Sequence, residues 1–242
     1  MMKPIWIISK RELSSFFDSL IAYVLLAIFL GLIGFFTWLT GDDVFNTGQA
    51  SLQHFFSVSY LILLFYIPAI TMRLLAEEKK TGTIELLLTK AISDRQVVVG
   101  KFLASFLFVC ISLTFTLPYV ATVASVGNVD SGEVICGYIG LLLMSAAYIS
   151  IGVYISSLTS NQIVSFLVSL VICVIFQYLF TIIAYSFKGF VGEMFSLLSV
   201  STHFESIARG VIDSKDLIYF LSLIFLGLFL AEISLSRRKI SG

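Results

Sequence analysis

The stretch LIAYVLLAIFLGLIGFFTWL, residues 20–39, contains twenty residues and no charged side chain. A helix rises about 1.5 Å per residue, so a stretch of this length spans the roughly 30 Å apolar core of a bilayer. No water is available there to pair with backbone groups, and an α-helix satisfies its own. The stretch therefore predicts a transmembrane helix.

Five more apolar stretches of similar length follow along the chain: residues 55–72, 102–126, 134–158, 163–187 and 217–236. The composition agrees, since 58% of the 242 residues are hydrophobic and 12% are charged, whereas about 25% are charged in soluble proteins. None of the stretches has the alternation of a strand. We expect an all-α integral membrane protein with six transmembrane helices, built as a single domain over residues 1–242. Pro68 and Pro118 lie inside the second and third stretches and predict kinks there, either static or acting as hinges.

Basic residues divide unevenly between the connections that join these stretches. Twelve of the fifteen Lys and Arg residues lie before the first stretch, in residues 73–101 or after the sixth stretch. The remaining connections, residues 40–54, 127–133 and 188–216, hold three basic and eight acidic residues. Because loops rich in Lys and Arg stay in the cytoplasm, both termini and residues 73–101 are expected on that side.

The N-terminal segment, residues 1–18, is too polar to cross a membrane. It combines apolar residues such as Trp6 and Phe16 with Lys3, Lys10 and Arg11. This composition favours a helix lying in the membrane interface with its bases toward anionic head groups. The alternative is a solvated lead-in to the first span.

The most highly charged connection, RLLAEEKKTGTIELLLTKAISDRQVVVGK, covers residues 73–101. Gly82 can take the left-handed conformation that ends a helix, and Thr83 can cap the helix that follows. Ser93 and Gln96 have the spacing of a capping box in front of the third span.

Between these signals, Ile84, Leu87 and Leu88 recur at spacings of three and four, so they share one face of a helix. We expect a short amphipathic helix on the cytoplasmic surface. It either contacts a soluble partner or simply forms a basic loop with an interfacial helix.

Three segments resemble motifs of the ABC-2 type permeases, the membrane subunits of ATP-binding-cassette (ABC) transporters. Residues 77–88, EEKKTGTIELLL, resemble the E-E-x-x-x-G-T-x-E-x-L-L signature after the second span. Residues 157–162, SLTSNQ, resemble the turn before the fifth helix. Residues 203–213, HFESIARGVID, are similar to the segment before the sixth helix, above all in the gliding-motility-associated subfamily. The chain departs from the family at residues 200–201 and at Ile92, where relatives have proline.

The resemblance implies a division of labour between two subunits. A separate nucleotide-binding subunit would hydrolyse ATP, and a cytoplasmic coupling helix of the permease would lie in a groove on that subunit. Residues 77–93 match this coupling segment. The residues assigned to coupling are Glu77, Glu78, Lys79, Lys80, Gly82, Thr83, Ile84, Glu85, Leu87 and Leu88. The expected partners are that ABC ATPase, a second permease copy or paralogue, and the lipid bilayer of a bacterial cytoplasmic membrane. The chain itself would bind no cofactor, because ATP and Mg²⁺ would be held by the ATPase.

The resemblance also implies that residues 188–216 form an outer-leaflet segment, a short re-entrant helical hairpin before the sixth span. The candidate residues there are Glu193, His203, Glu205 and Arg209. The charged ones either pair to tie the hairpin to a neighbour or are solvated.

Enzyme activity, metal binding and nucleic-acid binding are not expected. The Gly100–Lys101 pair is followed by Phe and preceded by Arg95 where a phosphate loop needs its first glycine. His54 and His203 have no second histidine at ligand spacing. The formal net charge is zero, and the bases follow membrane topology rather than a nucleic-acid groove.

Two functions remain open from the sequence. The favoured one is the permease half of an ABC exporter, linked to gliding motility or secretion. The alternative is a membrane scaffold or assembly subunit of an ATPase-driven motility or secretion complex that transports no solute. An ion channel or secondary carrier is disfavoured, because residues 102–126, 134–158 and 163–187 contain no Asp, Glu, Lys, Arg or His.

Overall fold

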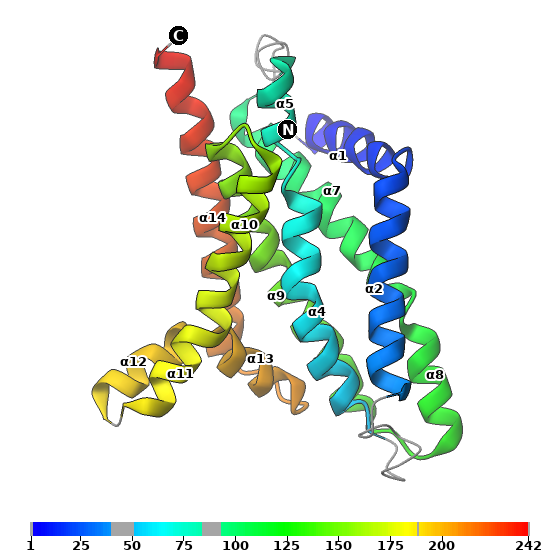
Figure 1. Ribbon diagram of the computed structural model, residues 1–242. Helices are drawn as coiled ribbons and strands as arrows, with labels where there is room; N and C mark the ends of the chain where they lie inside the picture. Colours follow the sequence, from blue (N-terminus) through cyan, green and yellow to red (C-terminus); the bar gives the residue numbers. More distant parts are fainter. Residues whose placement is uncertain (1, 40–50, 84–92, 188, 242) are drawn as a thin grey trace.

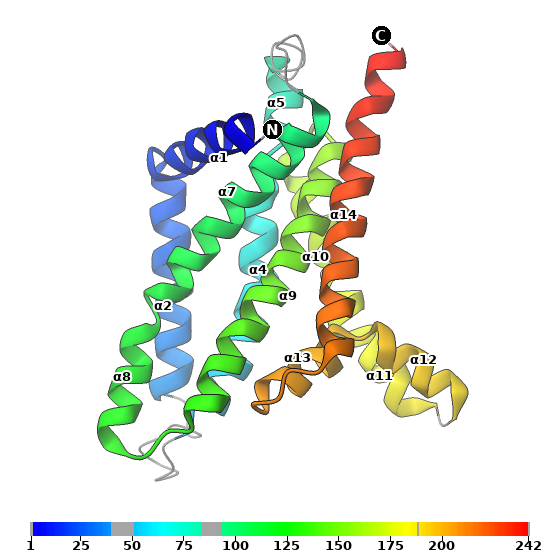
Figure 2. The same cartoon turned by 180° about the vertical axis from the view of Figure 1, so that it is seen from behind.

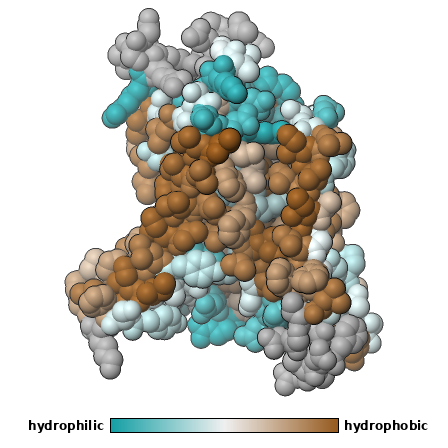
Figure 3. Space-filling view, in the orientation of Figure 1, coloured by the Kyte–Doolittle hydropathy of each residue, from teal (hydrophilic) through white to brown (hydrophobic). Residues whose placement is uncertain are grey.

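The computed structural model describes residues 2–39, 51–83, 93–187 and 189–241 (Figure 1). These residues form helices and no strand, and six of the helical stretches are long and apolar enough to cross a membrane. The prediction of an all-α protein with six spans is confirmed. Figure 3 shows the expected distribution of side chains, with a hydrophobic band between two polar ends.

The N-terminal segment forms α1 (Met2–Phe17), which lies across the top of α2 (Leu20–Leu39) in Figure 1. It packs along the start of α7 (Asp94–Thr114). The approach is close: a Cβ added to Gly100 would lie 2.7 Å from Ile8, and the Ser9 hydroxyl donates to the Gly100 carbonyl at 2.8 Å. A residue larger than glycine would push the two helices apart.

The second span is interrupted where it reaches the polar end. Helix α4 (Gln53–Thr71) contains Pro68, and a turn at residues 72–75 separates it from α5 (Ala76–Thr81). The sequence predicted the helix end at Gly82, whose φ of 72° is left-handed, but not the turn.

The third span is also divided, as Pro118 predicted. Helix α7 ends at Thr114, and α8 (Leu117–Val126) begins with Pro118 in its first turn. Proline suits that position because it has no N–H to leave unpaired there. The predicted capping box before α7 is present, with Ser93 and Gln96 each bonding the other's backbone N–H.

Helix α9 (Ser131–Leu158) lies in the centre of the bundle, as both views show, and contacts α4, α7, α10, α13 and α14 (Figure 2). Its longest neighbour is α14 (Ser214–Ser241). Small residues allow this approach: a Cβ on Gly227 of α14 would lie 2.8 Å from Cβ of Ser150. Close backbone packing of this kind is typical of membrane helices, where polar and small residues line the interfaces.

The fifth span differs from the single helix expected over residues 163–187. Helix α10 (Gln162–Val174) continues through a π-helical turn (Ile175–Leu179) into α11 (Phe180–Ser186), which points away from the bundle in Figure 1. Helix α12 (Phe190–Leu198) packs back on α11, and α13 (Val200–Ala208) leads to α14. The hairpin thus begins within the expected span, because the π turn changes the helix direction.

Candidate functional site

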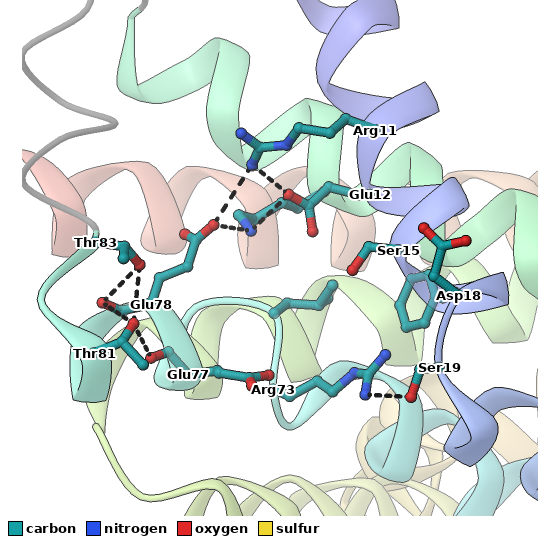
Figure 4. Close-up of a pocket in the computed structure, with 13 residues that line it drawn as sticks. Arg11, Glu12, Ser15, Asp18, Ser19, Arg73, Glu77, Glu78, Thr81 and Thr83 are labelled. Atoms are coloured by element: carbon teal, nitrogen blue, oxygen red, sulfur yellow. Dashed lines mark hydrogen bonds and ion pairs between the residues drawn. The ribbon is translucent and has the colours of Figure 1, made fainter.

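Four charged side chains meet where α1, α5 and α7 come together, at the end of the molecule that also holds both termini (Figure 1). Lys101 Nζ of α7 lies 2.8 Å from Glu78 Oε1 of α5 and 3.3 Å from Glu12 Oε1 of α1. Arg11 Nη2 lies 2.7 Å from the same Glu12 oxygen and 3.8 Å from that of Glu78. Figure 4 shows the carboxylates of Glu78 and Glu12 turned toward this shared point. We call these four residues the ion cluster.

The ion cluster balances two positive and two negative charges, of which Arg11 is 55% exposed and the other three are largely buried. The Lys101 side chain is 1% exposed, and those of Glu12 and Glu78 are 15% and 16% exposed. A buried charge is costly unless it is paired. Burial opposes ionisation of Glu12, but the attraction of Lys101 and Arg11 outweighs it, so the pKa of this carboxyl lies below its ordinary value. The ion cluster therefore fixes α5 to α1 and α7 only while its members stay charged.

A cavity of about 670 Å³ opens beside the ion cluster, between α1 and the end of the second span. Arg73 lines one side of this cavity: its guanidinium carbon lies 5.3 Å from the centre of the Phe16 ring, and Nη1 donates to the Ser19 hydroxyl at 3.4 Å. Figure 4 shows this contact at the far side of the cavity from Glu78. The turn after α4 is thereby attached to the end of α1 and to the short connection between α1 and α2.

The other side of α5 is attached to the central helix. The Ser156 hydroxyl of α9 accepts hydrogen bonds from the backbone N–H groups of Leu75 and Ala76, both at 3.0 Å. These are N–H groups at the start of a helix, which have no partner within it. The Lys79 ammonium donates to the Ser157 carbonyl, which also accepts from Ser234 of α14 at 3.1 Å.

The residues assigned to coupling thus fall into four groups. Glu78 and Lys79 bond within the chain, whereas Glu77 and Lys80 are exposed. Gly82 ends α5, and the Thr83 hydroxyl lies 2.9 Å from that of Thr81. The predicted amphipathic helix with Ile84, Glu85, Leu87 and Leu88 lies outside the described residues.

The short charged helix α5, anchored to three other elements, lies at the polar end of the second span. A family model described as ABC-2 family transporter protein matches residues 6–194. The chain belongs to the ABC-2 transporter family. Members of this family are the membrane components of transporters. A comparison with curated proteins found no match.

The match to the ABC-2 family runs from α1 into α12 and so includes the ion cluster and five of the six spans. It ends before α13, so residues 203–213, which carry the resemblance to the gliding-motility-associated subfamily, lie outside it. The contacts of α13 in this ABC-2 protein therefore have to indicate what its residues do.

At the end of the molecule opposite the ion cluster, His203 of α13 pairs with Asp216 of α14. His203 Nδ1 and Asp216 Oδ1 lie 2.6 Å apart, and both side chains are buried. His203 Nε2 lies 3.1 Å from the Leu197 carbonyl, which can only accept, so Nε2 carries a proton. The His203 ring stacks on Tyr219 at 4.0 Å between centroids. Together these contacts join α12, α13 and α14, which gives His203 a structural role.

The other outer candidates do not pair with one another within the described chain. The Glu205 carboxylate accepts from the Ser201 hydroxyl at 2.9 Å, and Arg209 Nε donates to the Glu205 carbonyl at 3.1 Å. Glu193 is exposed on α12. Of the two alternatives, the described contacts favour solvated charges over an ion-paired hairpin.

Sequence reasoning missed Lys101, Glu12, Ser156 and Asp216. Lys101 carried one signal, since it lies within α7, less than three turns after the capping box that starts this helix. The other three were ordinary polar residues, and only the packing of distant segments gives them partners.

Proposed function

We propose that this ABC-2 protein is the permease subunit of an exporter in a bacterial cytoplasmic membrane, driven by ATP hydrolysis in a separate ABC ATPase. ATP and Mg²⁺ bind to that ATPase, and residues 77–93 form the segment that it moves. The proposal orients the termini and the ion cluster toward the cytoplasm, in keeping with the excess of Lys and Arg at that end.

The observation that carries the proposal is the attachment of α5 on two sides. The ion cluster joins α5 to α1 and α7, and Ser156 and Ser157 join it to α9, the central helix. A force on residues that follow α5 therefore reaches three elements at once. Movement of packed helices about such contacts is a common form of two-state transition.

A second permease copy or paralogue completes the pathway in this proposal. Three spans are little buried within the described chain: 22% of the residues in an 18-residue stretch of α2 are buried, 17% in α10–α11 and 22% in α14, against 61% in α9. These faces suit lipid or a second subunit, and a six-helix chain supplies half of the pathway implied by the family resemblance.

A link to gliding motility or secretion rests on the resemblance of residues 203–213 alone. The alternative function, a scaffold in an ATPase-driven complex without solute transport, would use the same attachment of α5. Movement of a compound by proteoliposomes containing the complete complex, dependent on ATP, supports transport. ATPase activity stimulated by the permease, without movement of amphiphilic compounds across the bilayer, would favour the scaffold.

The coupling assignment is tested by co-purification with a partner ABC ATPase. Glu85→Lys with Leu87→Asp should leave membrane insertion intact and abolish co-purification. The matched control is Val211→Asp with Asp213→Lys, which makes the same types of change at the same spacing on exposed residues of the opposite end. If the first pair of substitutions leaves co-purification and ATPase stimulation unchanged, the assignment is wrong.

A further inference from the structure

A second cavity, of about 610 Å³, lies at the end of the molecule opposite the termini. It is enclosed by the starts of α4 and α9, by α11 and by α13. Its size is typical of sites for small ligands, which measure about 300–1,000 Å³. Three aromatic side chains contribute to its wall, Phe56, Tyr185 and Phe204.

Charged groups of both signs face this cavity with unused binding capacity. Arg209 uses Nε for a backbone carbonyl, and its two terminal nitrogens make no hydrogen bond or ion pair with any described residue. The Glu133 carboxylate likewise makes none within the described chain, and Glu205 has one oxygen engaged by Ser201. Asp130 differs, because its Oδ1 already caps α9 by accepting from Gly132 N at 2.8 Å.

Glu205 and Arg209 do not form an ion pair with each other within the described chain. They lie four residues apart on α13, a spacing at which oppositely charged side chains readily meet. No ion pair joins them in the described structure, so both remain available to a ligand. The cavity is lined by one guanidinium and three carboxylates, and Asp130 is the carboxylate already engaged in capping α9. Arg209, Glu133 and Glu205 together complement a molecule that carries a negative and a positive group.

The surroundings place the cavity near the depth of lipid head groups. The neighbouring α11–α12 hairpin exposes large apolar side chains, with Tyr185 81%, Phe190 75% and Leu197 60% exposed. Such a surface is stable in the membrane interface rather than in water. Figure 3 shows this apolar hairpin projecting beside a polar patch that lies below the hydrophobic band.

We propose that this cavity binds the head group of a zwitterionic aminophospholipid from the adjacent leaflet. The terminal nitrogens of Arg209 bind the phosphate, for which a guanidinium is well suited. The ammonium group lies between Glu133 and Glu205 beside the aromatic wall, where it gains ion-pair and cation–π attraction. The acyl chains remain in the hydrophobic band. This inference does not depend on ATP coupling or on which side of the membrane the cavity faces.

The test is native mass spectrometry of the purified permease with phosphatidylethanolamine, phosphatidylcholine and phosphatidylglycerol of identical acyl chains. Phosphatidylethanolamine should be retained at least about five-fold more than the other two, because it alone offers N–H donors to the carboxylates. Glu133→Gln with Glu205→Gln should remove this preference, and Arg209→Gln should reduce retention of all three lipids.

The matched controls, Glu193→Gln and Lys215→Gln, change exposed charges outside the cavity and should bind as the wild type does. Equal retention of the three lipids by the wild type, or a preference that survives the Glu133 and Glu205 changes, would overturn the proposal. Displacement of phosphatidylethanolamine by free phosphoethanolamine at similar concentrations would also overturn it and assign the cavity to a soluble phosphoamine. None of these results bears on co-purification with the ATPase, so the lipid proposal and the coupling proposal can fail separately.

Discussion

Replacing Lys101 by methionine should be among the most damaging single changes at the charged end. The substitution keeps an unbranched side chain of similar length but removes the cation that lies 2.8 Å from Glu78 and 3.3 Å from Glu12. Removing one partner of a buried ion pair costs about 3–5 kcal/mol, because the remaining charge is left in a medium of low polarity. Both carboxylates keep some access to water, at 15% and 16% exposure, so we expect about 3 kcal/mol, the lower end of that range.

The free energy of unfolding can be measured by titrating the purified protein in mixed micelles with sodium dodecyl sulfate and following helix content. The double variant Lys101→Met with Glu78→Gln should be more stable than Lys101→Met alone by at least about 1 kcal/mol, because it also removes the orphaned carboxylate. Lys80→Met is the matched control, since Lys80 is exposed on the same helix as Glu78, and it should change stability by less than about 0.5 kcal/mol. If Lys101→Met were as mild as the control, the ion cluster would not be what fixes α5 to α1 and α7.

Three further predictions concern other contacts of the bundle. Ser156→Ala removes the acceptor for two N–H groups at the start of α5 and should cost about 1–2 kcal/mol in the same titration, whereas Ser186→Ala, on exposed α11, should cost little. Gly227→Ala should cost about 1–3 kcal/mol because its Cβ would overlap α9, while Gly31→Ala meets open space and should be neutral or slightly stabilising; a thermal unfolding series separates them. The Glu12 pKa is lower in the folded state than its ordinary value of 4.5. The contribution of Glu12 to the free energy of unfolding is therefore present above that value and is lost as pH falls through the lower native pKa. Glu12→Gln should remove this part of the pH dependence, and an unchanged stability–pH profile would contradict the prediction.

Local signals in the sequence predicted much of the fold. The six spans, the left-handed end of α5 at Gly82 and the capping box of Ser93 and Gln96 each depend on residues close together in the chain. The break at Pro118 follows from the chemistry of one residue. These features were predictable because the forces that create them act within a few residues.

The contacts that make the candidate site were not predictable in the same way. Lys101 lies 23 residues from Glu78, and Ser156 lies 80 residues from Ala76, so nothing in the local pattern pairs them. The direction change at the π turn depends on packing as well, since Gln177 within it is buried and accepts from Tyr148 of α9 at 2.9 Å. A single sequence gives the elements, and tertiary contacts decide which polar residues meet.

The central claim is that the end bearing α5 faces the cytoplasm, where a soluble ATPase can bind it. The most direct measurement is labelling of single cysteines with a membrane-impermeant maleimide, in a variant whose three native cysteines are replaced by alanine. Lys80→Cys and Val211→Cys place exposed thiols at the two ends. The account predicts that Val211→Cys is labelled in intact cells and Lys80→Cys only after the membrane is permeabilised. Labelling of Lys80→Cys in intact cells would contradict it.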